Sequence, residues 1–146
     1  MAQFKNLHSL FKHIEKNIDE VLQNEVAQTG RQTMKKNIES EVYSKYTTKE
    51  YKRDREDGGL LDDANIPTTL LKSGVLSISS NRTDGNTNVS KVVTEGIGYT
   101  WEKSAIYNMQ PYPRRFVYQT FLELERTLSH LKAMKDGLRK RGFRVK

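Results

Sequence analysis

An apolar stripe with helical spacing runs through the N-terminal part of the chain and constrains the fold more than any other feature. Its first members are spaced 4, 3, 4 and 3 residues apart: Leu7, Phe11, Ile14, Ile18 and Val21. This spacing places them on one face of a helix. The sequence therefore predicts a long helix over residues 1–41, with a kink at Thr29-Gly30 because glycine disfavours a helix interior. Fully helical, the segment would extend for about 60 Å at 1.5 Å per residue.

A second helical spacing predicts a closing helix over residues 116–141. Phe116 begins this register and is expected in the core. The apolar positions that follow are 4, 3, 4, 3, 3 and 4 residues apart: Val117, Phe121, Leu124, Leu128, Leu131, Met134 and Leu138. Gly142 suits a C-terminal cap, so the helix should end near Arg141 and leave residues 142–146 as a basic tail.

The segment between the two helices predicts a loop over residues 42–69 and an antiparallel sheet over residues 70–103. A first strand is expected at 70–79, a hairpin turn at Asp84-Gly85, a return strand at 89–94 and a third strand at 97–101. The whole chain, residues 1–146, is then one domain of the α+β class. It has a long N-terminal helix, a small antiparallel sheet of about three strands, and a long C-terminal helix packed on the sheet.

Composition limits the classes of protein that this chain can belong to. Hydrophobic residues make up 35 % of it and the mean hydropathy is −0.78, which suits an elongated subunit that completes its burial by assembling. Cysteine is absent, so disulfides, thiolate metal sites and thiol nucleophiles are excluded. The sequence contains no run of eighteen apolar residues and no signal-peptide pattern. We expect a soluble protein without membrane contact.

Catalytic motifs are not recognisable in the sequence. It has no Gly-x-Ser-x-Gly elbow, no phosphate-binding loop and no His-Glu-x-x-His pair. His8 and His13 are five residues apart on the predicted helix, a spacing that does not align two metal ligands. We therefore expect no enzymatic activity, no metal and no cofactor.

The loop is the first candidate site, because tyrosine and arginine contribute much of the binding energy at protein interfaces. Six of its residues are candidates for contact with a partner or a neighbouring subunit: Tyr43, Tyr46, Tyr51, Arg53, Arg55 and Leu60. The alternative is a loop that folds back on its own domain. Its polarity also predicts mobility in the free subunit.

The basic C-terminal region is the second candidate site. Residues 1–113 contain fifteen Lys/Arg and fifteen Asp/Glu, whereas residues 114–146 contain ten and three, so this last region carries the whole net charge of +7. Such an excess suits a nucleic acid or an acidic protein. The alternative is a solvated helix face. Six residues are candidates for a DNA-facing or interface role: Arg114, Arg115, Lys135, Arg139, Lys140 and Arg141.

Taken in order, these segments resemble the tail-completion, or head–tail joining, proteins found in the neck of long-tailed bacteriophages. A long helix ends in Val42-Tyr43-x-x-Tyr46, and Tyr51-x-Arg53-x-x-x-x-Gly58-Gly59-Leu60-x-Asp62 follows. Strands come next, and Pro113-Arg114-Arg115-Phe116 then leads into an amphipathic helix with a Lys/Arg-rich end. The likeness spans most of the chain.

The resemblance implies a virion structural protein without enzymatic activity, located in the neck or tail and in the host cytoplasm during assembly. It implies a homo-oligomer, expected to be a ring, with other neck, connector or tail-tube proteins as partners and non-specific contact with packaged DNA. Two alternatives stay open on the residues alone. The first is a non-specific nucleic-acid-binding protein, and the second is a small basic ribonuclease toxin.

Overall fold

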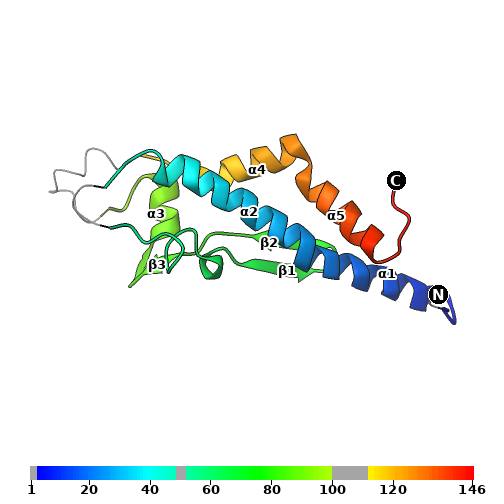
Figure 1. Cartoon of the computed structure of the whole chain (residues 1–146). Helices are drawn as coiled ribbons and strands as arrows, with labels where there is room; N and C mark the ends of the chain where they lie inside the picture. The colour runs from blue at the N-terminus through cyan, green and yellow to red at the C-terminus, as the bar shows by residue number, and fades with distance from the viewer. Residues whose placement is uncertain (1–2, 49–51, 100–111) are drawn as a thin grey trace.

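A long N-terminal helical rod dominates the computed structural model, which describes residues 3–48, 52–99 and 112–146 (Figure 1). The rod comprises α1 (Leu7–Val21), η1 (Leu22–Val26), α2 (Ala27–Ile38) and η2 (Glu39–Tyr43), where η1 and η2 are π-helical turns. Asn6 starts it with a capping box, since its side chain accepts a hydrogen bond from the Ser9 amide at 2.9 Å. The predicted long helix is confirmed.

The predicted kink at Gly30 is wrong, because α2 continues through this residue. Gly30 instead lets the rod approach the sheet closely. A Cβ atom at this position would overlap Cδ1 of Ile78 in β2. The glycine therefore serves packing between elements and not a bend in the helix.

Two short hairpins follow the rod. β1 (Thr68–Lys72) pairs antiparallel with β2 (Val75–Ile78), and β3 (Thr83–Asp84) pairs antiparallel with β4 (Thr87–Asn88). The predicted turn at Asp84-Gly85 is confirmed, with Gly85 at φ +53°. The single strand expected at 70–79 is wrong, because a turn with Gly74 at φ +77° divides it into β1 and β2. The described residues thus form two two-stranded sheets where one sheet of about three strands was expected.

The return strand expected at 89–94 is a helix, α3 (Val89–Glu95). Asn88 caps its start by accepting a hydrogen bond from the Lys91 amide at 2.9 Å, and Gly96 ends it in the left-handed conformation at φ +70°. The valines of this segment favoured a strand on propensity alone. Residues 97–99 of the expected third strand are not in a strand, and residues 100–101 lie outside the described part of the chain.

The closing helix is divided into α4 (Phe116–Thr127) and α5 (Ser129–Lys140). The single helix expected over 116–141 is interrupted by Leu128, which adopts the left-handed conformation at φ +52°. This conformation costs a non-glycine residue about 1–2 kcal/mol. The bend directs α5 back onto the rod, where a Cβ atom on Gly137 would lie 2.6 Å from Cγ1 of Val21. Close packing of α5 on the rod offsets the strain.

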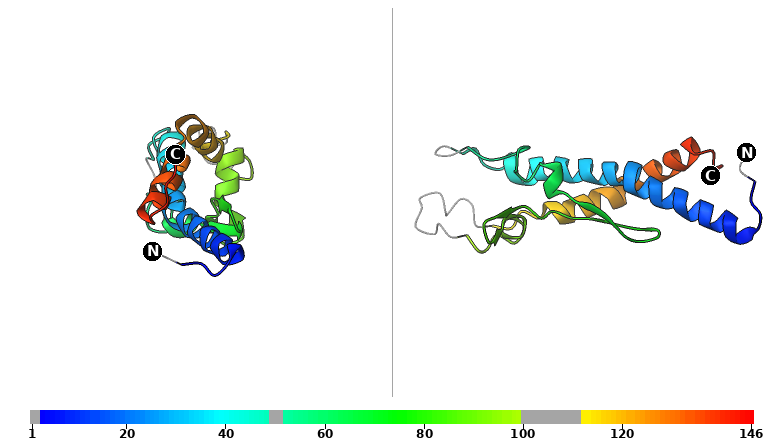
Figure 2. Two further views of the ribbon diagram at one scale, coloured as in Figure 1. Left: turned by 90° about the vertical axis from the view of Figure 1, so that its right-hand side faces the viewer. Right: turned by 90° about the horizontal axis from the view of Figure 1, so that it is seen from below.

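The core lies where the rod, α4, the loop and the first hairpin meet. Its buried members are Met34, Ile38, Val42, Tyr43, Leu60, Leu61, Ile66 and Phe116, with Ile78 and Val93 packed against them. The molecule is elongated, and the first turns of α1 project beyond the hairpins at one end (Figure 2). The α+β class of the sequence prediction is confirmed.

Candidate interaction surfaces

Tyr43 joins the end of the rod to the loop. Its ring is buried, its hydroxyl donates a hydrogen bond to the Asp54 carbonyl at 2.6 Å, and the Leu60 amide donates to the same hydroxyl at 3.3 Å. Burial raises the pKa of this phenol, so it stays neutral and keeps its hydroxyl proton. Tyr43 therefore holds two parts of the loop, at Asp54 and at Leu60, against the core.

The loop arginines pack on the same tyrosine. The Arg55 guanidinium lies 4.6 Å from the centre of the Tyr43 ring and forms an ion pair with Glu39. The Arg53 guanidinium lies 5.2 Å from the centre of the Tyr46 ring and donates to the Val42 carbonyl at 3.3 Å. These are cation–π and helix-end contacts made within one chain.

The loop residues proposed from the sequence thus come together, but around the subunit's own core. Leu60 is buried in that core, and Tyr46 is partly buried. Tyr51 lies outside the described residues. The alternative of a loop that folds back on its own domain accounts for every contact seen at Tyr43, Arg53 and Arg55, and their contact with a partner stays a prediction.

Arg82 binds the loop at Asp54 and Gly58. The sequence did not identify this residue as a candidate. Its Nε donates to the Gly58 carbonyl at 2.8 Å, and its Nη2 forms an ion pair with Asp54 at 3.0 Å. Asp62 accepts hydrogen bonds from the amides of Ala64 and Gly58, and these bonds lower the pKa of its carboxyl. No local signal marks Arg82, because its partners are far away along the chain. The segment whose polarity predicts mobility is therefore held by many polar contacts.

Arg114 is buried, with only 4 % of its surface exposed. Its Nη1 donates to the Val42 carbonyl at 3.4 Å, the same acceptor that Arg53 contacts, and its guanidinium lies 4.6 Å from the Tyr112 ring centre. Two cations thus meet the carbonyl end of the rod, where the helix dipole favours positive charge. This position does not suit the DNA-facing role suggested for Arg114. Arg115, its neighbour, is exposed.

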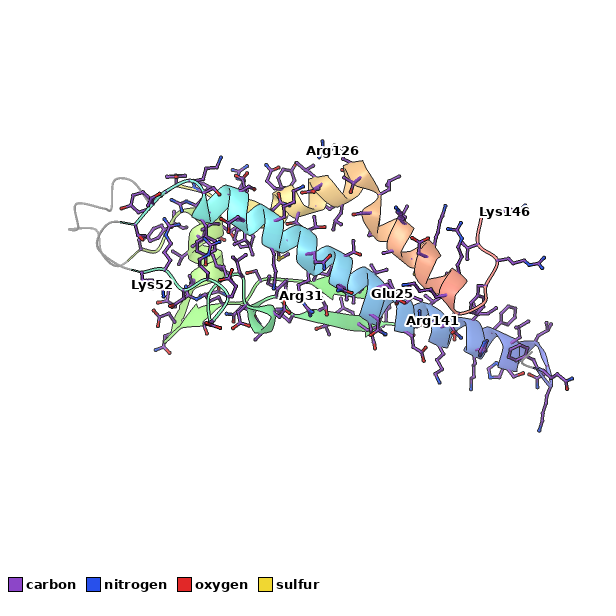
Figure 3. All side chains as sticks on the ribbon, in the orientation of Figure 1. Glu25, Arg31, Lys52, Arg126, Arg141 and Lys146 are labelled. Atoms are coloured by element: carbon purple, nitrogen blue, oxygen red, sulfur yellow. The ribbon has the colours of Figure 1, made fainter. Side chains whose placement is uncertain are left out.

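Of the other basic candidates, Arg141 is engaged within the chain. Its Nη1 lies 2.8 Å from Oε1 of Glu25 and its Nε lies 3.7 Å from Oε2 of Glu20, and Figure 3 shows Arg141 beside the rod. The hydrogen bond from Arg141 lowers the pKa of Glu25. Arg139 pairs with Asp136 at 3.2 Å.

Lys135, Arg139 and Lys140 are exposed on α5. They remain candidates for contact with DNA or protein, and the structure gives each of them access to solvent. The six basic candidates therefore do not form one surface. Arg114 is buried inside the subunit, and Arg141 forms ion pairs that join α5 to the rod.

An apolar surface that the sequence reasoning missed lies at the start of the rod. Leu7 and Phe11 are 70 % and 57 % exposed, although the hydrophobic spacing suggested a covered face. They lie one turn apart on the same side of α1. We call this pair the α1 tip.

A second apolar surface lies on α4. Val117, Tyr118 and Phe121 are exposed, with Phe121 at 58 %. They border a hollow of about 600 Å³ between the end of α3 and α4. We call it the α4 hollow, lined by Thr94, Glu95, Pro113, Arg115, Val117, Tyr118 and Phe121. The α4 periodicity identified an apolar face, but no element of the described structure covers this part of it.

Within residues 3–48, 52–99 and 112–146, no group of three or more His, Asp or Glu side chains is arranged to hold a metal ion. No helix in the described ranges is long and apolar enough to cross a membrane.

Glu123 gives the fold a dependence on pH. Its carboxylate accepts hydrogen bonds from Lys36 at 2.6 Å and from Asn37 at 2.9 Å, and these bonds, led by that from Lys36, lower its pKa. A carboxyl whose pKa is lower in the folded state stabilises the fold at neutral pH. The contribution is lost as the pH falls from the unfolded value, about 4.5, through the folded one.

We therefore expect the free energy of unfolding to fall on acidification below about pH 4.5. In Glu123→Gln, stability at pH 7 should fall by about 1 kcal/mol, and the acid-side slope should become shallower. Glu125→Gln is the matched control, because Glu125 is exposed on the same helix and forms no ion pair among the described residues. Urea titrations from pH 3 to 7 check the prediction, and equal slopes in both variants would contradict it.

The described residues form a small α+β subunit in which the loop residues cluster around the subunit's own core, and the α1 tip and the α4 hollow are uncovered apolar surfaces. A comparison with family models gives a match to the YomN family over residues 6–140, nearly the whole chain. The chain belongs to the YomN family, which is named after a protein from the SPbeta phage region of Bacillus, and this indicates a phage-associated protein. No curated protein and no solved structure matches the chain.

Proposed function

We propose that this protein is a virion structural protein of the neck or tail-completion type, which joins head and tail through contacts in an oligomeric ring. Membership of a phage-associated family supports the first part of this proposal. The resemblance in the order of segments, from the long helix to the basic closing helix, supports the second. No enzymatic activity and no cofactor belong to the proposal.

The observation that carries the proposal is the pair of uncovered apolar surfaces, the α1 tip and the α4 hollow. Burying one Leu or Phe side chain is worth about 1.5–3 kcal/mol relative to leaving it exposed. Leu7, Phe11 and Phe121 are each more than half exposed in the single chain. Assembly is the means by which an elongated subunit gains this burial.

The proposed partners are further copies of the chain and other neck, connector or tail-tube proteins. The proposed location is the virion neck or tail, with the host cytoplasm as the site of assembly. Exposed cations such as Lys135 and Lys140 would then face packaged DNA or an acidic neighbour.

The experiment measures the molar mass of the pure protein by light scattering over a range of concentrations, together with electron microscopy of the assemblies. We expect a defined ring oligomer. Phe121→Glu should weaken association about 30-fold or more, since an interface residue of this kind contributes about 2 kcal/mol.

Leu71→Glu is the matched control for Phe121→Glu. Leu71 lies in β1, belongs to neither the α1 tip nor the α4 hollow, and is 67 % exposed. It should leave the oligomer unchanged. A wild-type protein that stays monomeric at every concentration, also when mixed with neighbouring neck proteins, would overturn the proposal.

Non-specific nucleic-acid binding is the second candidate, and the exposure of Lys135, Arg139 and Lys140 along α5 favours it. Affinity for duplex DNA that falls steeply with rising salt would support this reading. Loss of that affinity in a triple Lys135→Gln, Arg139→Gln, Lys140→Gln variant would locate it.

A further inference from the structure

We infer that neighbouring subunits join head to tail, with the α1 tip of one copy seated in the α4 hollow of the next. This inference rests on the proposed ring and names the two surfaces that form it. Its occupant is a second copy of this chain.

The α1 tip has the features of a helix that docks into an apolar groove. Leu7 and Phe11 present two apolar side chains from consecutive turns of one helix face, which is the pattern by which helices dock into apolar grooves. The Asn6–Ser9 capping box fixes the start of this helix in the single subunit. The helix is thus already formed, and docking has less conformational entropy to overcome.

The α4 hollow has the form of a matching groove. Val117 and Phe121 provide apolar side chains on α4, and Pro113 and the end of α3 form the other lining. The Tyr118 and Phe121 rings lie side by side, with centres 6.4 Å apart. A volume of about 600 Å³ lies within the size of sites that bury several apolar side chains.

The two surfaces lie in different parts of the molecule. The α1 tip projects at the end of the rod where the N-terminus lies, whereas α3 and the start of α4 lie toward the opposite end (Figures 1 and 2). A tip therefore cannot reach the hollow of its own chain. Contacts between two different surfaces are heterologous, and they close into a ring when the rotation between subunits permits it.

Charge favours this pairing over contacts between like surfaces. Lys5 and Lys12 flank the α1 tip, and residues 3–16 contain three lysines against a single acidic residue, which lies one turn beyond Phe11. Glu95 lines the α4 hollow, and Glu125 lies one turn beyond Phe121. None of these four side chains forms an ion pair in the part of the chain that the structure describes.

A contact of two tips would place lysines against lysines, and a contact of two α4 faces would place Glu125 against Glu125. Tip against hollow brings opposite charges together, although Arg115 also lines the hollow. Avoidance of like charges is a common source of specificity at interfaces. The charge pattern therefore favours the heterologous contact.

The absence of cysteine from the chain makes a direct test possible. Leu7→Cys and Phe121→Cys each introduce the only thiol of their protein. The two full-length variants are mixed at a concentration at which the wild type is oligomeric, and are oxidised or treated with a short bis-maleimide. We expect a shift from monomer to covalent dimer in the mixture, and little or none in either variant alone.

The double variant, Leu7→Cys with Phe121→Cys, should give a ladder of covalent multimers that ends at the ring. Asn86→Cys, at the exposed tip of the second hairpin, is the control and should not crosslink to Leu7→Cys. An oligomer in which Leu7→Cys and Phe121→Cys do not crosslink would overturn this inference alone. Dimers of Phe121→Cys by itself would also overturn it, because they indicate a two-fold contact. A strictly monomeric wild type would overturn the ring proposal and this inference together.

Discussion

Phe116→Ala should lower the free energy of unfolding by about 3–5 kcal/mol, the usual cost of removing a fully buried phenylalanine ring. Phe116 is 0 % exposed and is one of the largest side chains in the core. It is the first residue of α4, and it packs in one cluster with Met34 and Ile38 of α2. Loss of the ring therefore weakens the contact between the N-terminal and C-terminal parts of the chain, because the surrounding structure can fill the cavity only partly.

Phe121→Ala is the matched control for Phe116→Ala. It removes the same side chain from the same helix, but at a position that is 58 % exposed. Its effect on the stability of the single subunit should stay within about 0.5 kcal/mol. Urea denaturation at a concentration where the protein is monomeric checks both variants, because association adds to apparent stability. Equal losses in the two variants would contradict the assignment of Phe116 to the core.

These two phenylalanines show how far hydrophobic spacing could predict the fold. The spacing identified α4 as an amphipathic helix and placed Phe116 in the core, and the structure agrees on both points. Phe121 lies five residues further on, about 140° around the helix from Phe116, so the two rings lie on different faces. The spacing marked the face of Val117 and Phe121, which is exposed, because a periodic pattern identifies an apolar face of a helix and not what covers that face. The same reason explains the exposure of Leu7 and Phe11.

Errors in element type had local and non-local causes. The strand expected at 89–94 ignored the Asn88 cap and the Gly96 stop, which are readable signals of a short helix. The break at Leu128 had no such signal, since leucine rarely adopts the left-handed conformation. There the packing of α5 on the rod through Gly137 overrides the continuous helical register.

The loop shows how far the candidate site could be predicted from the sequence. Sequence reasoning selected Tyr43, Arg53 and Arg55 as a group, and the structure brings them together in one cation–π cluster. It could not tell a contact with a partner from a contact within the subunit, because both use the same residue types. Arg82 was missed, since its contacts join residues that are far apart in sequence.

Gly59 is the position in this loop where substitution should have the largest effect. A Cβ atom there would overlap the backbone carbonyl oxygens of Asp54 and Arg55. Backbone atoms cannot move aside as a flexible side chain can, so the turn itself would have to open. The turn also positions the Leu61 amide, which donates to the Arg55 carbonyl at 3.0 Å, and the Leu60 amide, which donates to Tyr43.

Gly59→Ala should therefore lower the free energy of unfolding by about 3 kcal/mol, at the upper end of the range for overpacking. Gly58→Ala is the matched control. Gly58 has φ +73° and open space around its Cα, so alanine meets only the conformational cost of about 1 kcal/mol. Denaturation of both variants checks the difference, and hydrogen exchange at the Leu60 and Leu61 amides checks its origin. Faster exchange at these amides in Gly59→Ala than in Gly58→Ala would place the damage in the turn. Equal stability in the two variants would contradict the close contact of Gly59 with the Asp54 and Arg55 carbonyls.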